Sequence, residues 1–382
     1  MEPLKIRFME PAIHDQIVTL AQEAGFSKAG IAPVPSPGEE ADYAELRHFE
    51  PWIERGRAGE MQYLKRRDEA NRLLRSSLRI AIPWARSVIV CAANYNADAP
   101  KSVDPAPAES AWISRYAWTG QGPGKPSDYH DVLLARLKKL EQTLQQALGP
   151  FVSSCYVDTG PLVERIYAKY AGIGWIGKNT CIIDQELGSW LFLGVILTGL
   201  ELPSASPLRV ADDRCGSCTR CIDACPTGAL TAPYEMDGSL CIAYLTIEKR
   251  GPIPEPLRSQ MGRQVFGCDI CQDVCPWNRR APVNRDEDLV VRPELVNPAL
   301  AWLAELDAES FRRLFRQSPV QRTKLGGLLR NVAIAMGNSG LEEYLPKLRE
   351  WAAGPDPVLA EAAQWALARS EALAADDVVS GR

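Results

Sequence analysis

Eight of the eleven cysteines in this chain of 382 residues lie within one stretch. In order, the stretch contains Cys215-x2-Cys218-x2-Cys221-x3-Cys225-Pro226, a solitary Cys241, and Cys268-x2-Cys271-x3-Cys275-Pro276. The first run has the ferredoxin spacing, in which three close thiolates bind one 4Fe-4S cluster and the fourth, before a proline, binds another. The second run lacks its leading cysteine, which Cys241 can supply. The sequence therefore predicts two clusters, one bound by Cys215, Cys218, Cys221 and Cys275 and the other by Cys225, Cys241, Cys268 and Cys271.

Structural zinc is the main alternative to iron–sulfur ligation, because zinc is also bound by paired C-x2-C thiolates. Zinc seldom needs this run with a proline after its last cysteine, and it would not explain why the same ending occurs twice. A disulfide framework is typical of secreted chains, and nothing marks this chain as secreted. We therefore favour two clusters, which imply electrons passing singly through the protein. The other cysteines, Cys91, Cys155 and Cys181, are expected to be core residues.

The composition is that of an ordinary soluble globular protein, with 46% hydrophobic and 24% charged residues. A net charge of −5 excludes a polybasic nucleic-acid binder, so any RNA contact must come from a local patch. The first residues lack the apolar core of a signal peptide, and the longest apolar run, 190–200, is too short to span a bilayer. We therefore expect a cytoplasmic protein. With only His14, His48 and His130, histidine-rich metal chemistry is excluded.

Strands and helices alternate over the first half of the chain. Helical periodicity predicts helices over 12–24 and 131–148, and apolar runs predict strands over 26–34, 87–92, 152–158 and 190–198. This alternation indicates an α/β layer domain over residues 1–204. Residues 96–127 are rich in Pro, Gly, Ala and Ser, so a surface excursion is expected there.

The rest of the chain divides into two further predicted parts. Residues 205–290 hold the cysteines and have few long apolar segments, so the clusters are expected to substitute for hydrophobic packing. Residues 291–382 show helical periodicity throughout, in paired amphipathic segments that resemble a HEAT-type unit.

Two polar positions and one glycine run are candidate ligand contacts. The run 172–180, GIGWIGKNT, partly matches dinucleotide and phosphate loops, but it follows a helical segment and lacks Ser or Thr after Lys178. It is better interpreted as a turn that lets a bulky group approach the backbone. Asp158 ends a strand, where carboxylates of α/β sheets line a crevice, although such an Asp is more often a cap. His130 is interpreted as a helix-start residue, with a ligand role as the alternative.

A basic run follows in the helical part. Residues 311–330 contain no acidic residue, and their cations are Arg312, Arg313, Arg316, Arg322, Lys324 and Arg330. Such a run is usually a solvated helix face. On a chain of net negative charge it is also a candidate track for phosphates, which Arg279 and Arg280 would extend.

Several motifs, together with the cysteine frame, resemble the epoxyqueuosine reductase family over nearly the whole chain. They are GEMQYL (59–64), SDYH (127–130), VDTGPLVER (157–165), AGIGWIGKNT (171–180), CIAYLTIE (241–248), CDICQDVCPWN (268–278) and LLRNVAIAMGN (328–338). The resemblance implies a cobalamin-dependent enzyme with two 4Fe-4S clusters, related to reductive dehalogenases. Such an enzyme reduces epoxyqueuosine to queuosine at the wobble position of a tRNA with a GUN anticodon.

The resemblance also implies an architecture and a set of site residues. It implies a nitroreductase-like α+β domain for the corrinoid, a ferredoxin-like two-cluster domain and a HEAT-like helical region that holds tRNA. The family's proton donor falls on Asp158. Its cobalamin contacts fall on Arg66, Asp158, Ile182, Leu193, Ala243, Cys268 and Asp269. It further implies a monomer that takes electrons from an external donor such as a flavodoxin or ferredoxin system.

This sequence departs from the family pattern at two places and agrees with it on one independent point. Ala243 stands where the family motif would have serine, so a side-chain hydrogen bond is lost, and the segment before the DYH carries an unusual GQGPGKP. No histidine lies in the Asp-x-His-x-x-Gly motif that normally supplies a lower ligand to cobalamin. We therefore expect base-off cobalamin, against which glycines 172–177 and the apolar segment 189–200 could pack.

The mechanism that follows is a two-electron reduction of an epoxide to an alkene, with Asp158 as general acid. The main rival is a reductive dehalogenase for a small molecule, which has no need of a basic helical tail. A second rival is a two-cluster electron carrier, which leaves the first two hundred residues unexplained.

Overall fold

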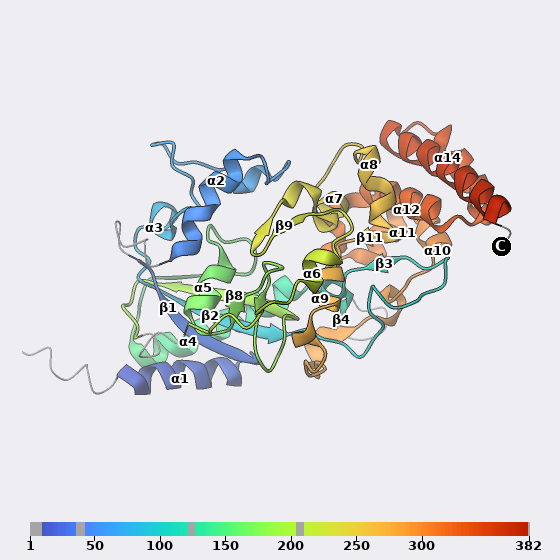
Figure 1. Cartoon of the computed structure of the whole chain (residues 1–382). Helices are drawn as coiled ribbons and strands as arrows, with labels where there is room; N and C mark the ends of the chain where they lie inside the picture. Colours follow the sequence, from blue (N-terminus) through green and yellow to red (C-terminus); the bar gives the residue numbers. More distant parts are fainter. Residues whose placement is uncertain (1–9, 36–42, 121–126, 204–209, 381–382) are drawn as a thin grey trace, which may run out of the picture.

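The computed structural model describes residues 10–35, 43–120, 127–203 and 210–380. A four-stranded sheet in the order β1-β2-β8-β5 forms the centre of the amino-terminal half (Figure 1). Its strands are β1 (Lys28–Pro33), β2 (Ser87–Asn94), β8 (Leu191–Thr198) and β5 (Ser153–Tyr156). These confirm the four strands predicted from apolar runs. Every neighbouring pair is antiparallel, and Asp158 lies just beyond the end of the edge strand β5.

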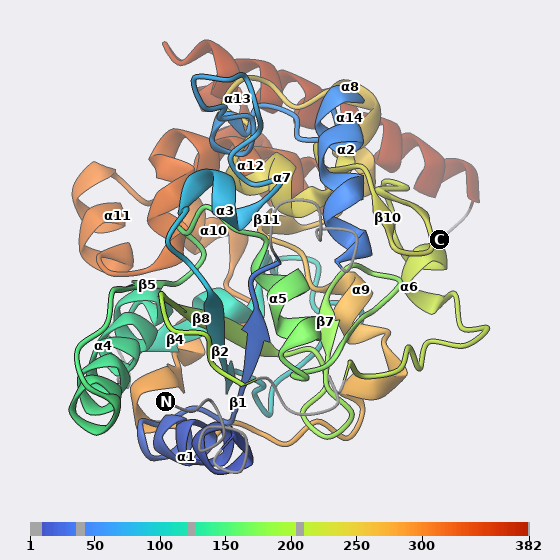
Figure 2. The same cartoon turned by 90° about the vertical axis from the view of Figure 1, so that its left-hand side faces the viewer.

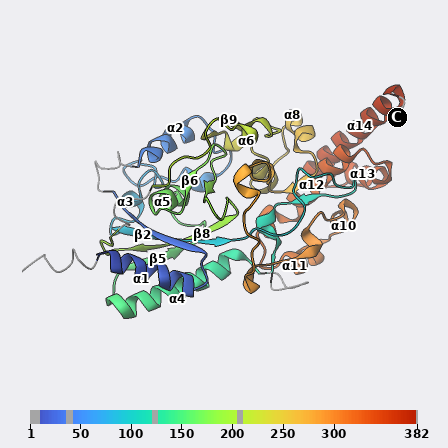
Figure 3. The same ribbon diagram turned by 60° about the horizontal axis from the view of Figure 1, so that its bottom comes forward.

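Helices cover both faces of this sheet, as Figure 3 shows. The helices are α1 (Glu10–Glu23), α4 (Tyr129–Leu148) and α5 (Glu164–Tyr170). Side chains of β2 alternate between the two layers, since Ile89 and Cys91 pack with α1 and α4 whereas Val88 and Val90 pack with α5. Strand β2 is therefore buried on both faces, which explains its continuous apolar sequence.

Short elements connect the sheet to the rest of the molecule. They are η2 (Ala44–His48), α2 (Phe49–Glu54), η3 (Gln62–Leu64), α3 (Leu78–Ala81), β3 (Trp112–Ile113), η4 (Arg115–Trp118) and β4 (Thr119–Gly120), followed by the hairpin of β6 (Trp175–Ile176) and β7 (Ile182–Ile183). The expected surface excursion was wrong for 110–120, because Trp112 and Trp118 are buried and β3 pairs with a strand of the cysteine region. Residues 121–126, which hold most of the GQGPGKP segment, lie outside the described residues.

The cysteine region is built from short elements. They are α6 (Arg220–Asp223), β9 (Leu230–Ala232), β10 (Glu235–Met236), η5 (Gly238–Leu240), α7 (Ile242–Ile247), α8 (Glu255–Arg258), η6 (Ser259–Met261), β11 (Gln264–Phe266), α9 (Ile270–Asp273) and η7 (Pro276–Asn278). The two cysteine runs lie side by side because α6 packs on α9. Strand β11 pairs in parallel with β3, which ties this region to the first half of the chain.

The carboxyl-terminal part is helical, as predicted. Its elements are η8 (Glu287–Leu289), β12 (Val290–Val291), η9 (Pro293–Leu295), α10 (Leu300–Ala304), α11 (Ala308–Phe315), η10 (Pro319–Thr323), α12 (Lys324–Ser339), η11 (Glu342–Tyr344), α13 (Leu345–Ala352) and α14 (Pro357–Ser380). Helix α14 packs on α12 and α13, and Figure 2 shows the three at one end of the molecule, away from α1.

One hydrophobic core joins segments that the sequence assigned to different domains. It contains Trp112 and Trp118, Leu245 and Phe266, and the inner residues of α12 such as Val332. The divisions 1–204, 205–290 and 291–382 stay predictions. In the described ranges, no helix is both long enough and apolar enough to cross a membrane.

Candidate active site

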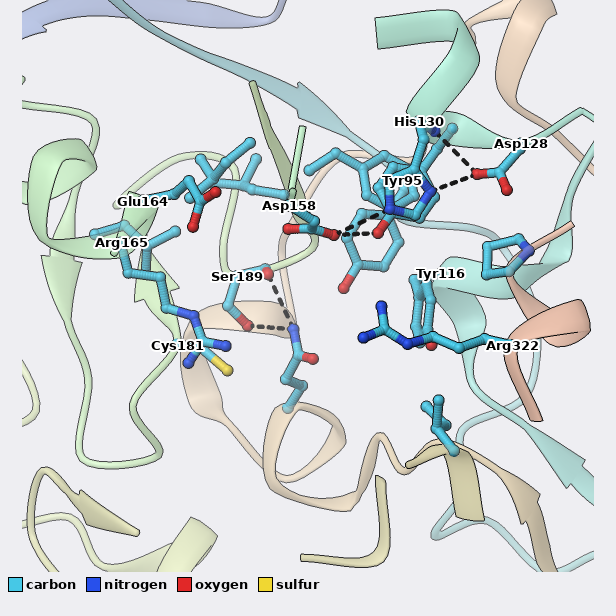
Figure 4. A pocket seen from close by; sticks show the side chains of 18 of the residues that line it. Tyr95, Tyr116, Asp128, His130, Asp158, Glu164, Arg165, Cys181, Ser189 and Arg322 are labelled. Carbon is cyan, nitrogen blue, oxygen red and sulfur yellow. Dashed lines mark hydrogen bonds and ion pairs between the residues drawn. The ribbon is translucent and has the colours of Figure 1, made fainter. Parts of the chain in front are cut away.

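A cavity of about 530 Å³ lies where the sheet, the cysteine region and the carboxyl-terminal helices meet (Figure 4). Strand β8 contributes Leu191, Phe192 and Leu193, and the start of α4 contributes Tyr129 and His130. Asp158, Cys181, Gln272 and Arg322 come from four further segments of the chain. Because all three predicted parts supply lining residues, the cavity forms only when the whole chain is folded.

Asp158 lies in the loop between β5 and α5 and lines this cavity. Its backbone has a φ of +57°, which is uncommon for a residue other than glycine but tolerated by Asp. The hydroxyl of Tyr129 donates a hydrogen bond to its Oδ2. The Asp158 side chain is 51% exposed, so in the protein alone solvent reaches this carboxylate.

His130 links Asp158 to a second carboxylate. Its Nε2 lies 3.6 Å from Asp158 Oδ2, and its Nδ1 lies 2.6 Å from Oδ1 of Asp128, the N-cap of α4. Burial lowers the pKa of His130, but the hydrogen bond to Asp128 and the charges of Asp128 and Asp158 outweigh it, so the pKa is raised overall. His130 does begin a helix as predicted, and its imidazole also faces the cavity.

Aromatic rings fix the position of Tyr129. Its ring stacks on Phe192 with centroids 4.0 Å apart, and Tyr116 contacts it edge-on at 6.1 Å. Burial raises the pKa of Tyr129, and the charge of Asp158 raises it further. Tyr129 therefore remains a neutral hydrogen-bond donor to Asp158.

Glu164, the first residue of α5, lines the same cavity and was missed by the sequence analysis. Its Oε1 is shielded from solvent and has no hydrogen-bond partner among the described residues. Burial, with the charge of Asp158 adding to it, raises the pKa of Glu164 to about 7. An acidic residue in the first turn of a helix is common for electrostatic reasons, so the sequence carried no signal of this burial.

The cysteines of the cluster stretch gather in two neighbourhoods. Burial raises the pKa of Cys275 to about 11, and the charges of Cys215 and Cys221, with that of Cys181 from outside the predicted sets, contribute. Burial likewise raises the pKa of Cys268, and the charges of Cys241 and Cys225 add to this effect. These neighbours are ones that the predicted ligand sets group together, and the assignment of ligands itself stays a prediction.

No disulfide forms, since all eleven cysteines are free. Across the described ranges, no three Cys, His, Asp or Glu side chains converge as they would around one metal ion. The thiolates of a 4Fe-4S cluster bind different irons, so they need not converge on one point.

Cys181 connects the cavity to the second neighbourhood of cysteines. It lines the cavity, and its thiol neighbours that of Cys271, one of the predicted cluster ligands. The sequence analysis expected Cys181 to be a core residue, because a single cysteine outside the C-x2-C runs carries no spacing signal. The cavity therefore lies beside the cysteine region.

The glycine run 172–180 contains β6 and the turn that leads to β7, so it is the turn predicted from sequence. A Cβ atom at Gly174 would lie 2.1 Å from the carbonyl oxygen of Ile183, so the bulky group that approaches this glycine is the partner strand itself. Lys178 Nζ donates to the carbonyl oxygens of Gly216 and Cys218, at 2.6 and 3.1 Å. The lysine of the apparent phosphate motif thus holds the first cysteine run.

Comparisons with known proteins agree with this geometry. A model of the 4Fe-4S double cluster binding domain matches residues 214–278, and the model of epoxyqueuosine reductase QueG, DUF1730, matches residues 75–159. The epoxyqueuosine reductase of Xanthomonas campestris is 38% identical over 357 residues, which cover 93% of this chain and 95% of that protein. The chain belongs to the epoxyqueuosine reductase family.

Solved structures of the epoxyqueuosine reductase family share the fold. One, described as epoxyqueuosine reductase with a tRNA-Tyr epoxyqueuosine-modified tRNA stem loop, has a TM-score of 0.79 and 28% identity over 94% of this chain and 90% of that one. The Streptococcus thermophilus structure has a TM-score of 0.78 and 30% identity over 94% of this chain and 90% of that one. The fold is therefore the mixed α/β fold of the family, with a double-cluster region and carboxyl-terminal helices.

The residues predicted from sequence as cobalamin contacts divide into two groups. Asp158, Ile182 and Leu193 line the cavity. The others lie outside its lining, and they are Arg66, Ala243, Cys268 and Asp269. Asp269 is buried and accepts hydrogen bonds from Trp112 Nε1 at 3.1 Å and from the backbone N–H of Arg115 at 2.7 Å.

The basic run predicted as a phosphate track divides in a similar way. Arg322 lines the main cavity, and Arg312, Arg313 and Arg316 line a second one of about 510 Å³ with Glu309 and Gln317. Arg330 is buried, because its guanidinium donates to the carbonyl oxygens of Leu245, Lys249 and Gly251. Including Arg330 in an exposed track was therefore wrong.

Proposed function

We propose that this chain reduces epoxyqueuosine to queuosine at the wobble position of the tRNA anticodon, the last step of queuosine biosynthesis. Family membership supports the reaction. The observation that carries it is a single cavity where a carboxylic acid, Asp158, meets proton-bearing partners and where Cys181 contacts the cysteine region. An epoxide reductase needs this combination, because it must deliver both electrons and protons to one site.

We propose base-off cobalamin as the cofactor of this cavity. One wall is apolar, formed by Ile182, Leu191 and Leu193, and suits the face of a flat macrocycle. The histidine among the lining residues, His130, has Nδ1 2.6 Å from Asp128 Oδ1 and Nε2 3.6 Å from Asp158 Oδ2, so each ring nitrogen faces a carboxylate, and His130 is not proposed as a lower ligand. When bound, cobalamin would supply a strongly reducing centre for the epoxide. Arg66, Ala243, Cys268 and Asp269 are proposed to contact its periphery.

Asp158 and the residues around it would donate and transfer a proton that the reaction consumes. Asp158 is proposed to protonate the epoxide oxygen as the carbon–oxygen bond breaks. Tyr129 holds one carboxylate oxygen in place, and His130 lies where it can return a proton to Asp158. A bound cofactor and substrate would exclude the water that reaches Asp158 in the protein alone.

Electrons would reach the cavity through the cysteine region. We propose the two clusters with the ligand sets predicted from sequence, and a one-electron donor such as a flavodoxin or ferredoxin system. Cys271 of the second set neighbours Cys181, and Cys181 and Gln272 line the cavity, so the cluster of this set would be the one that passes electrons to the cofactor.

The substrate is proposed to be the anticodon stem-loop of a tRNA with a GUN anticodon. Single-stranded loops allow a base to be inserted into a pocket while basic side chains hold the phosphates. The second cavity with Arg312, Arg313 and Arg316 precedes in sequence the segment that carries Arg322 into the main cavity. The helices α10 to α14 would act as a HEAT-like tRNA-holding region of a monomeric enzyme.

An anaerobic assay tests the function directly. The protein, reconstituted with clusters and cobalamin, is incubated with epoxyqueuosine tRNA and a strong chemical reductant, and the nucleosides are identified by mass spectrometry. Formation of queuosine only when cobalamin is present would support the proposed substrate, reaction and cofactor together. Absence of conversion with both cofactors intact would favour a corrinoid reductase of small molecules.

A further inference from the structure

The proposed reaction consumes two protons, of which Asp158 is proposed to give the first. Reduction of an epoxide to an alkene breaks two carbon–oxygen bonds, forms one carbon–carbon double bond and releases the oxygen as water. The two electrons come from a low-potential one-electron reductant through the clusters. Both protons end on the same oxygen, so the site needs either a second acid or rapid reprotonation of Asp158.

Glu164 is placed to be that second acid. It lines the same cavity as Asp158, which lies between β5 and α5, whereas Glu164 is the first residue of α5; Figure 4 labels both side chains. The two differ in their surroundings. Asp158 is half exposed and bound by Tyr129, whereas Oε1 of Glu164 is shielded from solvent without a partner among the described residues.

Burial, with the charge of Asp158 adding to it, favours the protonated form of Glu164. Arg75 and Arg165 act against this and lower its pKa, but less strongly. Arg75 donates to the carbonyl oxygen of Leu162 and Arg165 to that of Thr180, both at 2.8 Å, so each guanidinium is engaged by the backbone. An ionised carboxylate is costly to bury without a paired charge, and Asp158 adds repulsion. The pKa of about 7 follows from burial first and from Asp158 second.

We propose that Glu164 is a second general acid, which gives its proton to the departing epoxide oxygen after Asp158 has given the first. This inference rests on the proposed function. Two neighbouring carboxyl groups in unlike environments can take separate proton-transfer roles, since the environment sets which one keeps its proton.

The experiment compares Glu164→Gln, Glu164→Asp and the control Glu141→Gln in enzyme loaded with clusters and cobalamin. A glutamine side chain keeps the shape of Glu164 but cannot act as a general acid. Glu141 is a buried carboxyl group on α4 that does not line the cavity and is bound by Lys138 and Ser153. Single-turnover conversion of an epoxyqueuosine stem-loop is measured from about pH 5.5 to about pH 8.5.

We expect Glu164→Gln to lower the single-turnover rate on the order of 100-fold, with cofactor content and stem-loop affinity unchanged. The wild-type rate should fall as pH rises through about 7, and this limb should disappear in Glu164→Gln. Glu164→Asp should recover part of the rate, and Glu141→Gln should match wild type. A wild-type rate and pH profile in Glu164→Gln would overturn the proposal, as would loss of cobalamin absorbance, which would assign Glu164 to cofactor binding.

A thermal unfolding series separates this inference from the proposed function. Glu164 keeps its proton in the folded state from its ordinary pKa of 4.5 up to about 7, while the unfolded chain releases it. Wild type therefore loses stability as pH rises through this window, and Glu164→Gln does not. The melting temperature of the variant should rise relative to wild type between these limits. A constant difference would overturn the inference even if tRNA is converted, whereas a wild type that never converts tRNA would refute the proposed function.

Discussion

At the scale of single residues, one residue of the cavity lining, Asp158, has an uncommon backbone conformation. Asp158 has a left-handed backbone, which stores strain of order 1–3 kcal/mol for most residues. Tyr129 and His130, which follow the N-cap of α4, contact its carboxylate. Such strain is maintained where the surroundings fix a side chain for a function. The contacts from α4 are thus part of the catalytic arrangement that we propose.

Asp158→Asn should abolish most of the turnover while leaving the structure intact. Asn tolerates the left-handed backbone and keeps the side-chain shape, but it cannot donate an acidic proton. We expect a loss on the order of 100- to 10,000-fold in single turnover, with normal iron and cobalamin content. The measurement is anaerobic stem-loop conversion beside metal analysis. Asp131→Asn, on the exposed side of α4, is the matched control, and a fully active Asp158→Asn enzyme would contradict the role.

Protonation of His130 should stabilise the folded protein in mild acid, whereas protonation of a buried histidine without partners would destabilise it. Its folded pKa is raised because Asp128 and Asp158 outweigh burial, while Tyr129 stacks on its ring. The extra stability is fully present below the ordinary pKa of 6.5 and is lost as pH rises through the higher folded value. Relative to His130→Gln, wild type should therefore have its greatest advantage in melting temperature in mild acid. An advantage that grows above neutral pH would contradict the raised pKa.

At the scale of elements, periodicity predicted most of the fold but not its connections. The strands and the helices α1 and α4 were predicted because burial imposes a local pattern of 2.0 or 3.6 residues. The antiparallel order of the sheet was not, since strand direction depends on crossovers that leave no local pattern. The pairing of β3 with β11 was hidden for the same reason. Asp158 was found through its motif, whereas Glu164 was missed because its burial arises from distant segments.

Two glycines of α12 should respond in opposite ways to the same substitution. A Cβ at Gly337 would lie 2.7 Å from Cα of Ala366 in α14, whereas the nearest atom to a Cβ at Gly326 is Oδ2 of Asp356 at 3.6 Å. Gly337→Ala should destabilise the protein by about 1–3 kcal/mol through overpacking. Gly326→Ala should stabilise it by about 0.5–1 kcal/mol, because Ala restricts the unfolded chain and favours the helix. Urea unfolding of both variants checks this, and equal effects would contradict the close helix contact.

At the scale of the whole molecule, the parts form one structure around a shared core. Arg330 of α12 donates to three carbonyl oxygens in and after α7, and its neighbour Asn331 donates to the carbonyl oxygens of Thr246 and Val265. Burial lowers the pKa of Arg330 to about 10, and the charge of Arg250 contributes. These bonds hold α12 against the cysteine region, so the helical part and the cysteine region are packed as one unit.

The second cavity, lined by arginines at the end of α11, leads to a prediction about how the whole molecule binds tRNA. The chain carries a net charge of −5, so attraction to tRNA must come from a local surface, and Arg312, Arg313 and Arg316 line one cavity together. Each phosphate contact contributes roughly 0.7 to 0.9 to the slope of log affinity against log salt.

Replacing all three arginines by Ala should lower this slope by about 2 to 3 without changing the turnover of bound stem-loop. Fluorescence anisotropy over a salt series measures it, with Lys139→Ala on the exposed face of α4 as the control. An unchanged slope would place the phosphates elsewhere, and the exposed pair Arg279 and Arg280, which the sequence predicted as an extension of the track, would then be the surface to replace.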